Sequence, residues 1–357
     1  MGTQLLNSAD SHVIEPPDLW LANMPASLRD RAPQTTFKVH KGREYEVISV
    51  DGRAVRYEPP GWQDDKTRPP GAYDPRIRMK DMEAEGIWAE LLFPTVGQWC
   101  FQIQSREVAI EAARTYNDWL YAHFMKVSPR FVGAAMIPLI DIDDAVAEIR
   151  RVARMGYKAV LLPATPPVVA YNDPRYEQIW QTVAQTAVWP SVHIGTGADP
   201  MVTRGPGGAI INYVETGFPI QRSALNIVAA GVFDRFPTMK LLCVEGGASW
   251  LPGLVERMEE AYRKHSMWVR PKLSRSPTEI IREHVCATFQ HDRAFLDSLS
   301  VIGNDAVMWG SDYPHRESTW PNSAEILDSI FAGVPTSVRN AVTGGTFARF
   351  FPDSQAA

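Results

Sequence analysis

Short apolar runs alternate with longer amphipathic stretches along this chain, most regularly from about residue 131 onward. Such alternation is typical of βαβ units, in which a helix crosses over between two parallel strands. The runs that predict strands span residues 5–10, 88–93, 131–139, 158–162, 189–194, 240–245, 284–289 and 306–311. Eight strands that each lead into a helix can close into a ring, so the pattern predicts an α/β fold of the (β/α)8-barrel type.

Amphipathic stretches between these runs predict the helices that would surround the barrel. They span residues 105–127, 142–155, 174–187, 220–233, 249–266, 292–300, 323–331 and 337–350. One further segment, residues 79–86, would cross from the first strand to the second. Strands and helices therefore alternate around the whole predicted ring.

Residues 39–75 form the one large interruption of this alternation. A hairpin with a two-residue turn is predicted here. Its strands would be the alternating polar and apolar residues 44–50 and a second short run to residue 57, joined by Asp51-Gly52. A polar, proline-rich loop follows at 59–71. Because the insertion follows the first strand, we predict a flap beside the mouth of the barrel. A surface decoration that never contacts substrate is the alternative.

The length and charge of the chain narrow its class. A chain of 357 residues matches a single barrel domain, residues 1–357, that carries insertions. With 45% apolar and 22% charged residues it can bury a full core, which excludes disorder. The net charge is -5, and lysine and arginine are scattered rather than massed. Neither nucleic acid nor a membrane is therefore an expected partner, and we expect a small molecule instead.

The cysteines and the N-terminus indicate the compartment. Cys100, Cys243 and Cys286 lie far apart without CxxC spacing, which predicts buried, reduced thiols. The first residues carry no basic segment followed by an apolar core, and the chain contains no apolar stretch of membrane-spanning length. Cytoplasmic localisation is the resulting expectation.

Polar residues stand at the carboxyl ends of several predicted strands, where reactive groups gather in a barrel of this type. The first strand ends in Asp10-Ser11-His12, and alternation along a strand points Asp10 and His12 to the same side. The fifth strand ends at His193, the sixth at Glu245, and the eighth leads into Asp312. We expect these side chains to face one another inside the mouth of the barrel.

Each of these residues also has a structural explanation. His193 could be a hydrogen-bonded core histidine, Asp10 and Asp312 could cap turns, and Glu245 could pair with a buried arginine. Two imidazoles and two carboxylates on one face of a barrel favour a cation, because unpaired buried carboxylates are costly. The set Asp10, His12, His193 and Asp312 suits one divalent ion such as zinc or manganese, with a position open for water or substrate.

Three segments resemble the amidohydrolase-2 branch of the amidohydrolase superfamily, which includes amino-carboxymuconate-semialdehyde decarboxylase and γ-resorcylate decarboxylase. They are the opening Ala9-Asp10-Ser11-His12-Val13-Ile14-Glu15-Pro16-Pro17-Asp18-Leu19-Trp20, the Glu245-Gly246-Gly247 segment followed by Trp250, and Gly310-Ser311-Asp312-Tyr313-Pro314-His315. The resemblance covers nearly the whole chain. It implies a distorted TIM barrel with a mononuclear centre held by Asp10, His12, His193 and Asp312, and it implies that Asp312 also moves a proton.

The chain departs from the family pattern at two of these positions. Family members often carry histidine or glutamate where this chain has Asp10, a shorter carboxylate that must bring its backbone closer to the ion. Many members also carry an acid–base histidine at the end of the sixth strand, where this chain has Glu245. A buried glutamate with a raised pKa could exchange the proton instead. The end of the fourth strand, Leu162-Pro163-Ala164, offers no lysine that could bridge a second metal.

Further candidates lie in the loops. His315 could orient Asp312, or could be a loop residue held by Glu317 or solvent. For binding substrate we select Arg76, Trp99 and Trp320. The wider set of loop cations and aromatic residues that could do so also includes Arg78, Arg204, Trp62 and Phe101.

The resemblance implies non-oxidative decarboxylation of an aromatic or unsaturated carboxylic acid, with Asp312 or Glu245 supplying the proton. The alternative is hydrolysis of an amide, lactone or carbon–carbon bond by hydroxide generated at the metal. A third possible function is non-enzymatic: a metal-free barrel that binds a ligand or scaffolds a complex. A homodimer is expected by family analogy.

Overall fold

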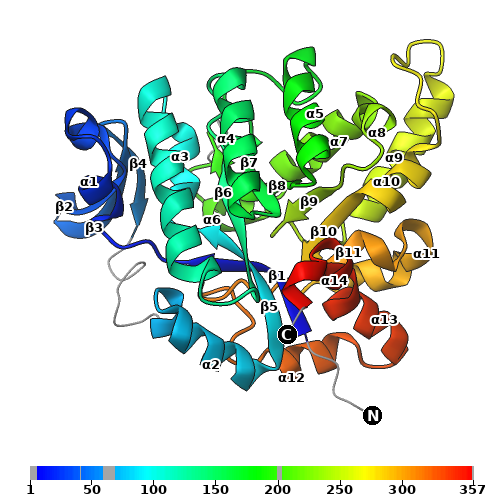
Figure 1. The fold of residues 1–357 in the computed structure, drawn as a ribbon. Coiled ribbons are helices and arrows are strands. Elements are labelled where there is room, and N and C mark those ends of the chain that lie inside the picture. The colour runs from blue at the N-terminus through cyan, green and yellow to red at the C-terminus, as the bar shows by residue number, and fades with distance from the viewer. Residues whose placement is uncertain (1–5, 41, 59–68, 199–202, 356–357) are drawn as a thin grey trace.

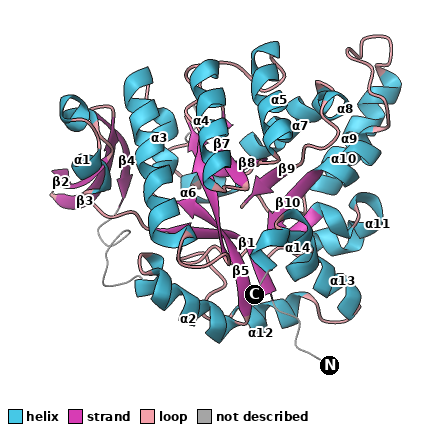
Figure 2. Ribbon diagram, viewed as in Figure 1, coloured by secondary structure: helices cyan, strands magenta, loops and turns pink. Residues whose placement is uncertain are grey.

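In the computed structural model, which describes residues 6–40, 42–58, 69–198 and 203–355, eight parallel strands form a nearly closed barrel inside a layer of helices (Figures 1 and 2). Their order around the barrel follows the chain. The strands are β1 (Leu6–Val13), β5 (Ile87–Pro94), β6 (Phe131–Met136), β7 (Ala159–Thr165), β8 (Trp189–Gly197), β9 (Leu241–Val244), β10 (Val285–Phe289) and β11 (Val307–Trp309). The prediction of a distorted TIM barrel is confirmed.

Strand β1 extends further than its sequence predicted. The predicted end was residue 10, whereas the strand continues to Val13. Its last residues pair with β5, with Ser11 opposite Leu92 and His12 opposite Phe93. His12 therefore lies within the strand, which holds its backbone in the barrel wall.

The helices also follow the prediction at most positions. They are α1 (Leu19–Asn23), α2 (Pro75–Glu85), α3 (Arg106–Leu120), α4 (Ile142–Met155), α5 (Glu177–Thr186), α6 (Gly208–Glu215), α7 (Phe218–Ala229), α8 (Val232–Arg235), α9 (Leu251–Lys264), α10 (Pro277–His284), α11 (Leu299–Ile302), α12 (Ser323–Ile330), α13 (Thr336–Asn340) and α14 (Thr346–Phe350). Helix α4 has the predicted bounds because Asp141 caps its first turn and Gly156, at φ 103°, ends it. Helices α1, α6 and α10 were not predicted. The chain does carry a signal for α10, the capping box of Ser276 and Glu279.

The insertion is a three-stranded antiparallel sheet of β2 (Gln34–His40), β3 (Arg43–Val50) and β4 (Arg53–Glu58). It lies beside α1 at the left edge of Figure 1. The hairpin of β3 and β4 is confirmed, and a third strand precedes it, since β2 pairs with β3 from Gln34. None of the side chains described in β2 is buried, and its alternating apolar residues Phe37 and Val39 are exposed.

The sheet packs on the loop that follows β5. Strands β3 and β4 contact the 3₁₀ turn Gly97–Gln102, and Arg53 donates to the Gln102 carbonyl at 2.9 Å. The insertion thus borders a loop at the carboxyl end of a barrel strand. Most of the proline-rich loop, with Trp62, lies outside the described residues, and the flap stays a prediction.

The barrel closes where β1 meets the segment after β11. The Asp312 N–H donates to the Asp10 carbonyl at 2.8 Å, and the His12 N–H donates to the Tyr313 carbonyl at 2.5 Å. Next to these two hydrogen bonds, the hydroxyls of Ser8, Ser11 and Ser311 lie 3.0–3.1 Å apart. Backbone closure therefore brings together the two chain segments whose polar residues the sequence singles out.

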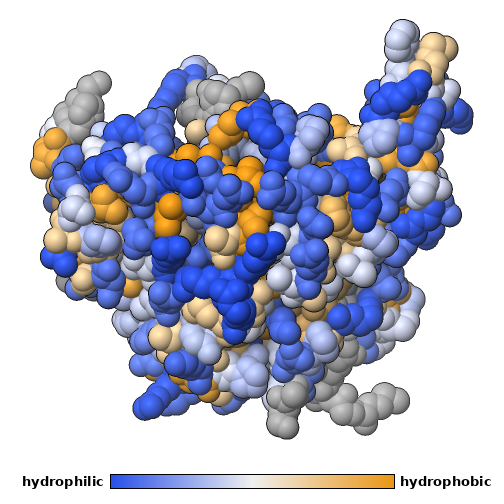
Figure 3. All heavy atoms as spheres, turned by 45° about the horizontal axis from the view of Figure 1, so that its top comes forward, coloured by the Kyte–Doolittle hydropathy of each residue, from blue (hydrophilic) through white to orange (hydrophobic). Residues whose placement is uncertain are grey.

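The core and surface show the expected separation. All three cysteines are buried and free, which confirms the prediction of reduced thiols. The face in Figure 3 is largely hydrophilic, with a few small hydrophobic patches. Within the described part of the chain, every helix is too short or too polar to cross a bilayer.

Close packing where β1 meets the segment after β11 makes Gly310 sensitive to substitution. A Cβ on Gly310 would overlap the Cβ of Asp10 and would lie 3.2 Å from its backbone nitrogen. We expect Gly310→Ala to lower the free energy of unfolding in urea by about 1–3 kcal/mol, because β1 and this segment must move apart to admit the methyl group. Gly253→Ala is the control, since this exposed position in α9 has open space and alanine favours helix there. Equal stability of the two variants would contradict the account of closure.

Candidate metal centre

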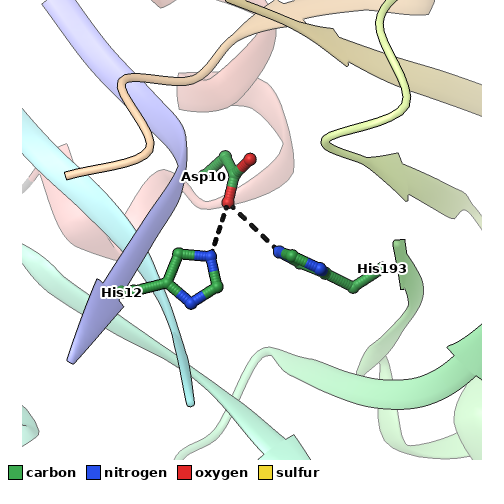
Figure 4. A group of neighbouring side chains, drawn as sticks. All are labelled: Asp10, His12 and His193. Atoms are coloured by element: carbon green, nitrogen blue, oxygen red, sulfur yellow. Dashed lines mark hydrogen bonds and ion pairs between the residues drawn. The ribbon is translucent and has the colours of Figure 1, made fainter. Parts of the chain in front are cut away.

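The four predicted ligands lie together at the carboxyl ends of β1, β8 and β11, and all four are fully buried. Figure 4 shows a ring nitrogen of His12 and of His193 directed at the Asp10 carboxylate. The Asp10 Oδ1 atom is 3.5 Å from His12 Nε2 and 3.4 Å from His193 Nε2. The Asp312 Oδ1 atom is 3.4 Å from His12 Nε2. Residues from distant parts of the sequence thus form one compact cluster.

The donor set fits a divalent cation. The structure has a possible metal site formed by Asp10, His12 and His193, whose ligand atoms lie within 4.8 Å of one another. Asp312 shares two similar groups, one with His12 and His315 and one with Asp10 and Glu245. Among the described residues, the buried atoms Asp10 Oδ2, His12 Nε2 and Asp312 Oδ2 find no hydrogen-bond partner. Such lone pairs are costly to bury unless a cation or donor meets them.

Backbone carbonyls set the tautomers of both imidazoles. His12 Nδ1 lies 2.9 Å from the Pro94 carbonyl, and His193 Nδ1 lies 3.0 Å from the Ile194 carbonyl. A carbonyl only accepts, so each Nδ1 carries the hydrogen and each Nε2 presents a lone pair to the cluster. Metal-binding histidines are typically held in this way.

Burial and neighbouring charges give the carboxyl groups of the cluster different pKa values. Burial alone would raise the pKa of Asp10, but hydrogen bonds from His12 and His193, when their Nε2 atoms carry a proton, outweigh burial and lower it. Burial and then the charge of Asp10 raise the pKa of Asp312 to about 8. Burial, with the charges of Asp312 and Asp10, raises the pKa of Glu245 well above its usual range. The protein groups alone therefore leave two carboxyl groups protonated, and a divalent charge among them would favour their ionised forms.

Two of these residues have an unusual backbone. Glu245 has φ 65° and Asp312 has φ 57°, in the left-handed region, and the described chain has only two other such non-glycine residues, Asp51 and Ala187. This conformation costs on the order of 1 kcal/mol or more per residue and persists where the surroundings impose it. At Glu245, the backbone N–H donates to the Thr288 hydroxyl at 2.7 Å. Backbone strain is therefore concentrated at the cluster.

Glu245 and His315 border the cluster from the side of the loops. Glu245 Oε2 lies 3.5 Å from His193 Nε2, and its side chain is 16% exposed, unlike those of the four buried residues. His315 Nδ1 lies 2.9 Å from Asp312 Oδ1, and its ring stacks on His12 with centroids 4.0 Å apart. The contact with Asp312 matches the orienting role considered for His315, which stays a prediction.

The predicted substrate contacts lie farther out. Arg76 is exposed in the first turn of α2, Trp99 lies in the 3₁₀ turn under Arg56, and Trp320 packs edge-on against Tyr313. Their roles in binding stay predictions.

Arg78, a candidate for binding a substrate anion, is corrected by the structure. It is fully buried, donates to Glu90 at 2.6 Å and donates to the His12 carbonyl at 2.7 Å. Arg78 therefore supports the strand that carries the ligands instead of facing the mouth.

Sequence reasoning missed several residues that touch the cluster. The side-chain amide of Gln98 lies 3.2 Å from His193 Nδ1 and must turn its oxygen toward it, since that nitrogen carries the hydrogen. The Thr95 hydroxyl lies 3.3 Å from His315 Nε2. Gln290 directly follows β10, and its side-chain amide interacts with Asp312. Position after a strand end could have identified Thr95 and Gln290, whereas Gln98 carried no such signal.

The family model and the curated relatives that match this chain both cover most of it. The amidohydrolase family model matches residues 16–352. A γ-resorcylate decarboxylase from Rhodococcus jostii (strain RHA1) is 25% identical over 279 residues, which cover 71% of this chain and 82% of that protein.

Solved structures share the fold. The crystal structure of an amidohydrolase from Mycobacterium avium subsp. paratuberculosis K-10 superposes with a TM-score of 0.80 at 20% identity, covering 98% of this chain and all (100%) of the other. A 5-carboxyvanillate decarboxylase from Novosphingobium aromaticivorans DSM 12444, crystallised with bound manganese, gives a TM-score of 0.68 at 17% identity, covering 98% of this chain and 97% of the other.

The pKa shifts predict how pH acts on protein stripped of metal by a chelator. Asp312, with a pKa near 8 in the fold against 3.8 as its ordinary value, binds a proton in the folded state that the unfolded chain has released. Stability should therefore fall as pH rises toward 8. His12, whose pKa burial and then the charge of His315 lower to about 4, acts oppositely between about pH 4 and 6.5. Above pH 6.5 only the carboxyl groups act, so we expect a loss of up to about 2 kcal/mol per group between pH 6.5 and 8.

Urea unfolding of the chelated protein at pH 6.5 and pH 8 measures this loss. Asp312→Asn is the control, since an amide cannot titrate and the loss should shrink. Stability that stays constant or rises over this interval in the chelated wild type would contradict the assigned shifts.

Proposed function

The chain belongs to the amidohydrolase family, and from this premise we propose that it is a metal-dependent, non-oxidative decarboxylase of an aromatic or unsaturated carboxylic acid. The observation that carries the proposal is a buried group of side chains suited to a divalent ion, with the carboxyl group of Glu245 and the imidazole of His315 directly beside it. The decarboxylase names of the relatives support the same reaction.

Asp10, His12, His193 and Asp312 would hold one divalent ion, zinc or manganese. When bound, the ion supplies positive charge that orients a substrate carboxylate or neighbouring hydroxyl and stabilises negative charge on the substrate oxygen. Two carboxylates with two imidazoles suit either metal. The manganese bound in the 5-carboxyvanillate decarboxylase structure favours manganese.

Decarboxylation requires a proton at the carbon that bears the carboxylate. That carbon takes the proton, the bond to the carboxylate breaks, its electron pair returns to the ring, and carbon dioxide leaves. Two carboxyl groups could supply the proton: Asp312, whose Oδ1 atom lies 2.9 Å from His315 Nδ1, and Glu245, whose Oε2 atom lies 3.5 Å from His193 Nε2.

His315 would keep this proton available. The Thr95 hydroxyl donates to the Val13 carbonyl at 2.8 Å, so it can only accept from His315, whose Nε2 therefore carries a hydrogen. The remaining nitrogen, Nδ1, lies 2.9 Å from Asp312 Oδ1, within proton-transfer distance. We therefore assign one shared proton to Asp312 and His315, with His315 as the group that returns it to Asp312 after turnover.

Residues around the mouth would bind the rest of the substrate. Trp99 and Trp320 would wall an aromatic ring, and Arg76 would attract a carboxylate. Phe93, whose ring lies 4.8 Å from that of His193, adds an apolar surface next to the ligands. The substrate is thus a small aromatic acid, and a homodimer remains part of the proposal.

Glu245 also supports a second candidate, hydrolysis of an amide, lactone or carbon–carbon bond. Many family members have a histidine at the end of this strand, whereas here a carboxyl group lies 3.5 Å from His193. In a hydrolase Asp312 would take a proton from water, and Glu245 would deliver one to the leaving group.

A panel of substrates separates the two reactions. We expect carbon dioxide release from one or more hydroxybenzoates, with one deuterium at the vacated carbon when the solvent is D2O. Mass spectrometry of the product measures both. Acid release from esters or lactones, without carbon dioxide from any acid of the panel, would favour hydrolysis instead.

Glu245→Gln tests the proton donors. We expect normal metal content and a turnover number lower by about 10²–10⁴-fold, because the amide keeps the shape but cannot exchange the proton. Glu283→Gln is the matched control, since Glu283 is half exposed near the end of α10, where the chain enters β10 at the opposite end of the barrel. Wild-type turnover in Glu245→Gln would assign Glu245 to structure.

A further inference from the structure

One short segment touches every imidazole of the cluster. Residues 94–98 leave β5 at its carboxyl end, whereas the three imidazoles come from β1, β8 and the segment after β11. The contacts are His12 Nδ1 to the Pro94 carbonyl (2.9 Å), His315 Nε2 to the Thr95 hydroxyl (3.3 Å) and His193 Nδ1 to the Gln98 amide (3.2 Å). The orientation of all three rings therefore depends on where this segment lies.

A single buried carboxylate holds the segment. Glu15 is only 3% exposed. Its Oε2 accepts from the backbone N–H groups of Thr95 (3.3 Å) and Val96 (3.0 Å), and its Oε1 accepts from that of Gly97 (2.8 Å). Three successive N–H groups that point at one anion form a concave anion-binding backbone. Each would otherwise be a buried donor in need of an acceptor.

The packing around this carboxylate is tight. A Cβ on Gly97 would lie 3.0 Å from Glu15 Oε1, 2.8 Å from the Pro94 Cβ and 2.7 Å from the Met136 sulfur. Only glycine lets the backbone approach so closely. The segment and Glu15 therefore have one close-packed arrangement, and a change in either must move the other.

The anchor and two ligands leave the same strand. Glu15 follows His12 by three residues, and between them the Val13 carbonyl accepts from the Thr95 hydroxyl at 2.8 Å. The end of β1 thus supplies Asp10 and His12 and also fixes the loop that orients the imidazole of His12. Displacement of the loop would disturb every imidazole at once.

We propose that Glu15 is a positioning residue for the metal centre, which sets metal affinity through residues 94–98 without touching the metal. A glutamine at this position keeps one accepting oxygen but turns an NH2 group toward backbone N–H donors. The loop must then shift, and the imidazoles lose their orientation. Loss of groups that orient metal ligands weakens metal binding by about 10–100-fold.

The experiment measures affinity for Mn²⁺ and Co²⁺ by competition with a chromophoric chelator, together with urea unfolding in excess chelator. We expect Glu15→Gln to weaken both metals by about 10-fold or more and to change the visible absorption of the Co²⁺ protein. Asp51→Asn is the matched control. Asp51 likewise accepts from backbone N–H groups, those of Gln104 (3.1 Å) and Ser105 (3.0 Å), but in a segment without an imidazole contact. It should lose stability with affinity and spectrum unchanged.

Wild-type affinity and spectrum in Glu15→Gln, with a loss of stability like that of Asp51→Asn, would overturn the proposal and assign Glu15 to folding alone. If Glu15→Gln does not fold, Gly97→Ala displaces the same segment without changing charge and carries the same prediction. The proposal rests on the metal assigned in the proposed function. Wild-type protein that binds neither metal would refute that assignment, whereas wild-type binding with unaffected variants would refute only the role of Glu15.

Discussion

The cost of burying Asp10 and Asp312 side by side shapes the rest of the structure. The two residues meet because the Asp312 N–H donates to the Asp10 carbonyl where the barrel closes. Closure of the sheet and convergence of the ligands are therefore the same event. Burial, and then repulsion between the carboxylates, raises the pKa of Asp312 and of the neighbouring Glu245. A divalent cation relieves this repulsion and meets the unpaired atoms of Asp10 and His12.

Supporting contacts hold the cluster from two sides. From within the barrel wall, Arg78 pairs with Glu90, donates to the His12 carbonyl and lies 4.1 Å from the centre of the Tyr313 ring. From the mouth, residues 94–98 meet the imidazoles and are themselves held by Glu15. Asp10, His12 and His193 lie on strands, whereas Asp312, Glu245 and His315 lie in segments that follow strands. A rigid donor set beside less confined acids suits a site that must bind a metal and release a product.

Most of the fold and the convergence of the four candidate ligands could be predicted because both follow from local rules. Buried parallel strands are apolar runs, and reactive side chains stand at their carboxyl ends. Strand β2 could not be predicted, since it lies at an edge and buries no side chain that is described. Arg78 resembled a surface cation, and only its tertiary pairing with Glu90 at 2.6 Å reveals its role. Gln98 and the anchoring by Glu15 depend on loop conformation, which has no sequence period.

The central claim is that one divalent ion lies among Asp10, His12, His193 and Asp312. Anomalous diffraction from crystals grown with Mn²⁺ tests it most directly, because the anomalous signal locates the metal independently of the protein atoms. The account predicts one strong peak at about 2.0–2.3 Å from a nitrogen of each histidine and an oxygen of each aspartate. Crystals saturated with Mn²⁺ that show no peak there, or a peak held by His315 and Glu245 with Asp10 and His12 beyond bonding distance, would contradict it.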